Sequence, residues 1–394
     1  MQRHQQSLST INNEKHAEMF EKIKQAIVAI QSKQHSSLSF EVLYRSSYTL
    51  VCEKHGDLLL DAYQKLTKQH LTETVVPELL RCVDASGNFL EILCRFWNEY
   101  STMLGMIRDI LMYLDRVYIQ PGMLSVYQSA LSMFRTEVSC VHVVNEQIQL
   151  TLLSMISSER HGQSIQWGII KSIVKMLMAL GIESRAYYED NFERFFLKET
   201  EDHYRLAAER FIAEKSSIEY VEKVHKCIAY EFDRCQRYLD SSTEAKVNSL
   251  LIIILASESK VTAVLEKKDS GFEFMLNNNR INDLVSLFEF VKHSKRGPQK
   301  LVDILGNHVC TKGKQIMSAI ESKVSNPVDS IEEIANLHEQ FDEYLVNAFK
   351  NDQACRKAIQ SAIEEFFNLS SRSPEYLSLY IDDKLKKGPK KQMI

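Results

Sequence analysis

Glycine and proline are scarce in this sequence. It has 12 glycines and 6 prolines in 394 residues, against average usage of roughly 7% and 5%. Because these residues punctuate turns and strand ends, their scarcity indicates few turns and long elements. Apolar residues recur at three- and four-residue steps almost throughout, and no alternating run is bounded by hairpin turns. We therefore predict an all-α fold.

Long hydrophobic runs are also missing. The longest, Leu250 to Ala256, is far shorter than the roughly 20 apolar residues that a membrane-spanning helix needs. The first residues, Met1 to Thr10, are polar and lack the apolar core of a signal peptide. We expect synthesis in the cytosol and no membrane partner.

Excess charge of one sign is absent, and so is a disulfide pattern. The formal net charge is −4, whereas nucleic-acid binders usually carry a basic stripe that displaces counterions from phosphate. We therefore expect no nucleic-acid partner. The cysteines form no C-x-x-C pair and lie in apolar segments, so we expect buried free thiols in a reducing compartment. They are Cys52, Cys82, Cys94, Cys140, Cys227, Cys235, Cys310 and Cys355.

Catalytic and metal-binding motifs are missing as well. The sequence has no phosphate-binding glycine loop, dinucleotide fingerprint, nucleophile elbow or EF-hand loop. His338 and Glu339 begin a zincin-like pattern, but Asp342 stands where the second histidine belongs. His225 and Cys227 are two residues apart and cannot share a helix face. We predict a protein that is no enzyme and has no cofactor or metal.

The helical segments are separated by clusters of turn-forming residues. Turn chemistry predicts breaks at Gly56, 84–87, Pro121-Gly122, Gly162, Gly181, Gly271, Gly297-Pro298 and Asn326-Pro327. The segment lengths suggest three divisions of about five helices each, at 13–135, 136–249 and 250–369, stacked as an elongated series of bundles. Two basic segments, 292–300 and 384–391, are interpreted as solvated surface.

One predicted helix carries an aromatic residue at every fourth position: Phe40, Tyr44 and Tyr48. Ser39 is a plausible N-cap for it. At 100° per residue these aromatic residues span a stripe about 80° wide, while Leu43 and Leu50 lie on another side. A core needs only one of the two apolar sectors unless the helix is wholly buried. A fully buried helix and a partner-binding helix both remain open.

A second helix, from Met103 to Ile119, shows a similar division. Its core stripe is predicted to be Ile107, Ile110, Leu114 and Val117. Tyr113 and Arg116 lie off this stripe. Exposed Tyr and Arg are the residue types most enriched at interface hot spots, so this helix also suggests a binding surface.

These same residues resemble the cullin family. The segments 38–45, 54–56 and 106–118 resemble the first cullin repeat, and 371–388 resembles the junction between the helical stalk and the C-terminal half. The resemblance covers the chain after about residue 13. It implies a stalk of three five-helix repeats in the scaffold of a multisubunit ubiquitin ligase, with 370–394 as the start of the C-terminal domain.

Among cullins, the sequence of residues 38–41, together with Tyr44 and Tyr48, resembles the paralogue that binds BTB-domain substrate adaptors. The resemblance implies a dimeric adaptor in a 2:2 assembly, found in cytoplasm and nucleus. A RING subunit would bind only through a C-terminal half that this sequence does not contain. The implied adaptor-binding residues are Leu38, Ser39, Phe40, Glu41, Leu43, Tyr44, Tyr48, Lys54, Tyr113 and Arg116.

The sequence departs from the family pattern at several positions. Val42 replaces an acidic residue, Ser46 and Ser47 form a divergent pair, and the segment Met1–Asn13 is short where the paralogue has a longer extension with adaptor contacts. Two other functions remain open. A helical rod of a vesicle-tethering complex would bind other tether subunits, and a transport receptor would show a 40-residue repeat, which is not found.

Overall fold

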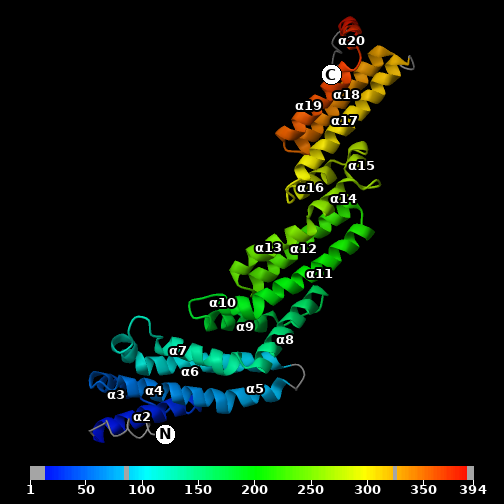
Figure 1. Ribbon diagram of the computed structural model, residues 1–394. Helices are drawn as coiled ribbons and strands as arrows, with labels where there is room; N and C mark the ends of the chain where they lie inside the picture. Colours follow the sequence, from blue (N-terminus) through cyan, green and yellow to red (C-terminus); the bar gives the residue numbers. More distant parts are fainter. Residues whose placement is uncertain (1–13, 84–87, 323–325, 388–394) are drawn as a thin grey trace, which may run out of the picture. The chain divides into compact units, whose positions relative to one another are not determined.

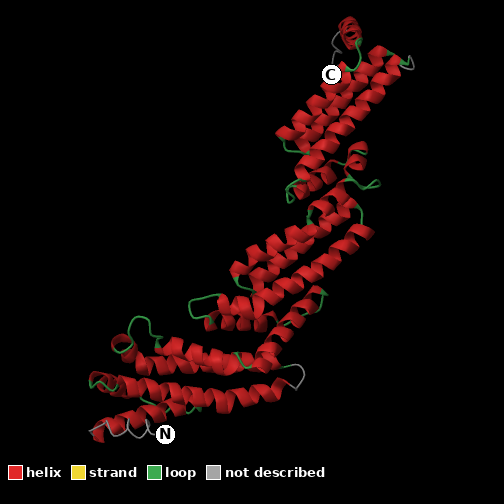
Figure 2. Ribbon diagram, in the orientation of Figure 1, coloured by secondary structure: helices red, strands yellow, loops and turns green. Residues whose placement is uncertain are grey.

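The computed structural model describes residues 14–83, 88–322 and 326–387. Within these ranges every regular element is a helix and no strand occurs (Figure 2). The prediction of an all-α fold is confirmed. Helices dominate because their apolar residues repeat at the helical period and few glycines or prolines interrupt them.

The chain divides into two compact units, the first made of Met1–Glu199 and Arg234–Glu244. Figure 1 shows its helices α4 and α5 continuing one another alongside α6. The helices of this unit are α2 (Glu14–Gln31), α3 (Phe40–Cys52), α4 (Gly56–His70), α5 (Val76–Val83), α6 (Phe89–Val117), α7 (Val126–Phe134), α8 (His142–Arg160), α9 (Trp167–Leu180) and α10 (Ala186–Tyr188). Three short π-helical segments follow α4, α7 and α10, namely η1 (Leu71–Val75), η2 (Arg135–Ser139) and η3 (Glu189–Glu193).

The second unit comprises Thr200–Asp233 and Ala245–Ile394. The division falls within α11 (Arg194–Glu214), α12 (Ser217–Tyr238) and α13 (Ser241–Leu255). The remaining helices are α14 (Glu258–Leu265), α15 (Phe272–Asn277), α16 (Ile281–Val291), α17 (Gly297–Glu321), α18 (Pro327–Asn347), α19 (Gln353–Asn368) and α20 (Ser373–Lys387). The division into three repeats, at 13–135, 136–249 and 250–369, stays a prediction.

Several predicted breaks coincide with helix ends. Gly56 opens α4, Gly297 and Pro298 open α17, and Asn326 caps α18, where its side chain accepts a hydrogen bond from the backbone N–H of Val328 at 3.2 Å. The predicted break at 84–87 lies outside the described residues. The sequence therefore predicted helix ends correctly where it contains a capping residue, such as Asn326, or a proline at the start of a helix, such as Pro298.

Two sequence predictions about burial are wrong. Val117 is 56% exposed because it is the last residue of α6, where Tyr118 packs on Gly56 instead. Cys52 and Cys140 are exposed and not buried, because each lies at the end of a helical element. The cysteines are free, as predicted. Ser39 occupies the N-cap position of α3, but its side chain makes no capping hydrogen bond.

No single helix of the described ranges is long and apolar enough to cross a bilayer. The pair Ser241–Leu255 and Glu258–Leu265, bent by 49°, passes the same test together on length and composition alone.

A cluster of partly buried charges joins α8 to the end of α12 in the first unit. Glu159 accepts hydrogen bonds from Arg234 at 2.9 Å, from Arg237 at 3.0 Å and from the Tyr238 hydroxyl at 2.6 Å. A carboxylate removed from water in this way is stable only when its oxygens find such donors. The cluster therefore specifies how these two helices pair.

The closest packing in the second unit joins α17 to α19. A Cβ atom added to Gly313 would lie 2.2 Å from the ring of buried Phe366, and one added to Gly306 would lie 3.7 Å from Ala358. Gly313 thus leaves room for the aromatic ring, and this close approach requires glycine.

We expect Gly313→Ala to lower the free energy of unfolding by about 1–3 kcal/mol, because overpacking against Phe366 outweighs the gain in helix propensity. The matched change Gly105→Ala in α6 has no atom within 4 Å of the new methyl group. It should instead stabilise the protein by up to about 1 kcal/mol. Denaturant titration measures both, and equal effects of the two changes would contradict the packing argument.

The histidine His308 of α17 is buried, with its ring 6.2 Å from that of Phe341. Burial lowers the pKa of His308 to about 4. In the unfolded chain the ring binds a proton near its ordinary pKa of 6.5. Between these two values the unfolded state binds more protons, so stability falls as the pH is lowered from 6.5 to 4.

We expect His308→Leu to remove roughly 2–3 kcal/mol of the stability loss between pH 7 and 4.5. Denaturant midpoints measured across this pH range test the expectation. The control His142→Leu changes a side chain that is 89% exposed and should leave the pH profile nearly unchanged. An unaltered profile in His308→Leu would contradict the role assigned to this histidine.

Candidate protein-binding surface

Helix α3 has one buried and one exposed face. The buried residues are Leu43, Ser46, Ser47, Leu50 and Val51, and they pack toward α2 and α6. On the other side Phe40 is 36% exposed, Tyr48 is 44% exposed and Tyr44 is half-buried. A wholly buried helix is therefore excluded, and the second apolar sector faces solvent.

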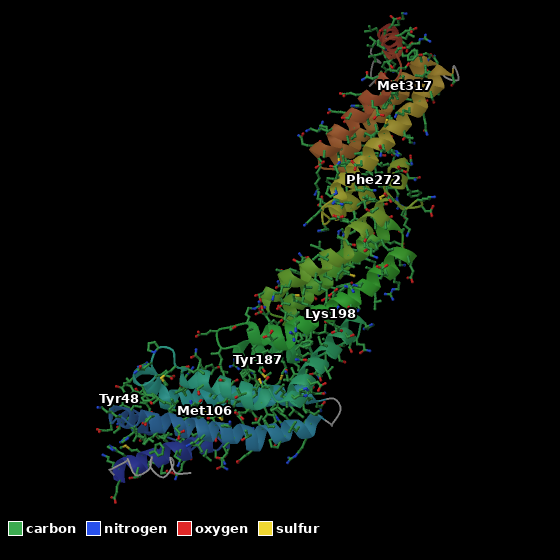
Figure 3. All side chains as sticks on the ribbon, in the orientation of Figure 1. Tyr48, Met106, Tyr187, Lys198, Phe272 and Met317 are labelled. Atoms are coloured by element: carbon green, nitrogen blue, oxygen red, sulfur yellow. The ribbon has the colours of Figure 1, made fainter. Side chains whose placement is uncertain are left out.

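The exposed stripe of α3 continues onto α6 through a pair of tyrosines. The rings of Tyr48 and Tyr113 lie 4.4 Å apart between centroids and are tilted by 50°. The Cys52 thiol donates a hydrogen bond to the Tyr113 hydroxyl at 3.9 Å. Hydrogen bonding with Cys52 raises the pKa of both tyrosines, so both phenols stay protonated near neutral pH. Figure 3 shows Tyr48 at one end of the N-terminal helices.

Two cationic residues flank the tyrosine pair along the chain. Arg116 lies nearly one turn after Tyr113, is exposed, and forms no ion pair among the described residues. Lys54 follows α3 in a left-handed conformation with φ of 64°, which costs about 1–2 kcal/mol in a residue with a side chain. Its N–H bonds the carbonyl of Val51 at 3.1 Å, and its side chain is exposed.

The remaining predicted residues contribute less open surface. Leu38 is half-buried and Ser39 is exposed. Glu41 is exposed and paired with Arg45 at 2.6 Å, an interaction that contributes little to stability at the surface. Leu43 is 7% exposed and supports the helix from the core. The aromatic residues therefore lie at the surface, and Leu43 lies in the core.

A close contact between α4 and α6 holds the turn after α3 in place. A Cβ atom at Gly56 would lie 2.7 Å from the Tyr118 ring and 3.3 Å from Leu114. This residue opens α4 immediately after Lys54 and His55, and Tyr118 is the C-cap residue that follows α6. The absence of a side chain at Gly56 therefore lets the end of α6 pack against the start of α4.

Sequence reasoning missed several exposed apolar residues on α6 and after it: Met112, Val117, Met123 and Leu124. A signal existed for Met112, because helical spacing places it beside Arg108, Arg116 and other charged positions. No such signal existed for Val117, whose spacing fits the core stripe. Met123 and Leu124 lie in a loop, where periodicity says nothing about burial.

Among the described residues, the departures from the family pattern lie away from the aromatic stripe of this surface. Val42 is exposed, but at 100° per residue it lies about 160° around the helix from Tyr44. Ser46 and Ser47 are buried and do not face a partner. The segment Met1–Asn13 lies outside the described residues.

Comparison with protein families identifies the architecture. Residues 20–393 match the cullin alpha solenoid domain. The predicted all-α solenoid of this family is thereby confirmed, and the match extends over both units of the chain. A vesicle-tethering rod and a transport receptor do not account for such a match.

Individual relatives support the same conclusion. The chain is 33% identical to Cullin-3 of Caenorhabditis elegans over 97% of its own length and 50% of that protein. It is 36% identical to Cullin-3 of Dictyostelium discoideum over 93% of its length and 47% of that protein. Identity to human Cullin-4A is lower, at 26% over 94% of the chain and 47% of that protein.

The chain spans about half the length of these relatives. Its greater identity to the two Cullin-3 proteins than to Cullin-4A agrees with the paralogue that the sequence around Phe40 suggested. The family match and these relatives show that the chain belongs to the cullin family.

Proposed function

We propose that this chain is the adaptor-binding part of a cullin-RING ubiquitin ligase scaffold, and that it binds a BTB-domain substrate adaptor through α3 and α6. The observation that carries the proposal is the tyrosine pair of exposed Tyr48 and half-buried Tyr113, beside exposed Phe40 on a helix whose other face is buried. Covering the exposed part of these aromatic side chains removes apolar surface from water, which suits the centre of an interface.

The surface offers both apolar anchors and unpaired charge. The aromatic stripe would fill apolar pockets on the adaptor. Arg116 has no ion pair in the described residues and is available to a carboxylate or carbonyl of the partner. Rim cations of this kind contribute more to association rate and specificity than to affinity.

The proposed mechanism is geometric and not catalytic. The adaptor holds the substrate, and the helical scaffold sets its distance from a RING subunit bound through a C-terminal half such as the longer relatives contain. The rate of ubiquitin transfer then depends on the effective concentration of substrate near the ubiquitin-carrying enzyme. A dimeric adaptor would give a 2:2 assembly, in cytoplasm and nucleus.

We expect Tyr48→Ala to weaken binding to a BTB adaptor by about 2 kcal/mol or more, roughly thirtyfold in Kd, because it removes a central aromatic anchor. Phe40→Ala should act in the same direction. Calorimetric titration of folded variants measures the change. Tyr230→Ala is the matched control, since Tyr230 is an exposed tyrosine of α12 in the other unit.

The same titration with a Skp1-type adaptor tests the paralogue. Binding to the BTB domain alone is the expected result. Binding to the Skp1-type adaptor alone would keep the scaffold and reject the proposed partner. Unchanged affinity for the BTB domain in Tyr48→Ala would reject the proposed surface.

Val42→Glu restores the acidic character that the family commonly has at this position. Because Val42 lies about 160° around α3 from Tyr44, we expect the affinity for the adaptor to change by less than about threefold. Surface substitutions away from special contacts usually stay within about 0.5 kcal/mol. A tenfold change in Kd would show that the interface reaches the other side of α3.

A further inference from the structure

A cavity of about 320 Å³ lies in the first unit, between the end of α2, the segment η1–α5 and the first half of α6. Its walls include four buried apolar side chains: Ile30, Val75, Phe96 and Met103. Ligand pockets commonly measure about 300–1,000 Å³, so this cavity suits a small ligand with an apolar body. None of the residues of the proposed adaptor surface lines it.

The lining of the cavity includes two charged side chains, Arg95 and Glu78, that form no ion pair with any described residue. Lys33 and Glu99 also line it, but they neutralise each other in an ion pair at 2.6 Å. Arg95 stacks on Phe96, with its guanidinium carbon 5.3 Å from the ring centroid. Within the described ranges neither Arg95 nor Glu78 forms a hydrogen bond or ion pair, so one cation and one anion remain available to a ligand.

Two further features make this more than a gap between helices. The wall includes Thr74 and Val75 of the π-helical segment η1, a distortion of helix geometry that occurs often at functional sites. His70 lines the same space, and burial lowers its pKa, so it is neutral near pH 7. Arg95 is therefore the cation left to attract an anionic group.

We propose that this cavity binds a small zwitterion with an apolar body, such as a free amino acid with a branched aliphatic or aromatic side chain. Arg95 binds the carboxylate, Glu78 binds the ammonium group, and the side chain covers Phe96 and Met103. Charge-assisted hydrogen bonds to both ends give the selectivity, while the apolar wall selects the side chain.

The test uses three probes with the same side chain. Leucine carries both charges, leucinamide lacks the carboxylate, and N-acetylleucine lacks the ammonium group. Ligand-observed NMR titration of the full chain measures their affinities. We expect leucine to bind at least about tenfold more tightly than either analogue, because each analogue loses one charge-assisted contact.

Two variants assign each charge to its contact. Arg95→Gln should abolish the preference for leucine over leucinamide and keep the preference over N-acetylleucine. Glu78→Gln should do the reverse. Arg108→Gln and Glu91→Gln are the controls, since both residues are exposed on α6 and outside the cavity. Both controls should keep both preferences.

Absence of leucine binding, equal affinity for the three probes, or preferences that survive both variants would overturn the proposal. Circular dichroism verifies that each variant is folded. Adaptor affinity measured on Arg95→Gln should match that of the unchanged chain. Failure of the leucine test therefore does not contradict the proposed adaptor surface. Failure of the adaptor-binding test likewise does not contradict the proposed ligand of the cavity.

Discussion

One-sided burial of α3 is the constraint on which the proposed binding surface depends. Leu43 and Leu50 draw one face of this helix into the core, and at 100° per residue this forces Tyr48 and the edge of Phe40 into water. The Tyr48 ring then finds Tyr113 on the neighbouring helix. Burial of one face of α3 thereby leaves aromatic side chains at the surface. A partner that covers them removes apolar area from water, which favours binding.

Close contacts between helices depend on glycine at a few positions. Gly56 admits the Tyr118 ring, and Gly313 admits Phe366. At such places a single methyl group matters more than helix propensity, since packed interiors have no spare volume. The first of these contacts brings the end of α6 against the turn that carries Lys54. Packing between helices beside the proposed surface thus sets the geometry that a partner would meet.

The proposed adaptor surface and the cavity lie in the same unit but use different side chains. The surface relies on aromatic residues and on Arg116, which forms no ion pair in the part of the chain that the structure describes. The cavity combines an apolar wall with Arg95 and Glu78. Unpaired charges are informative in a chain where so many Lys, Arg and Glu residues form surface ion pairs. Both are proposed as sites of binding and not of catalysis.

The sequence by itself determined the all-α fold and the aromatic stripe of α3, because each depends on a local period of 3.6 residues. It also carried the segments by which the cullin family was recognised. Only the tertiary structure decided that Val117 and Cys52 are exposed, that Ser46 and Ser47 are buried, and that Arg95 and Glu78 share a cavity. Exposure at helix ends and the charges around a cavity depend on where neighbouring helices stop, and no local pattern records this.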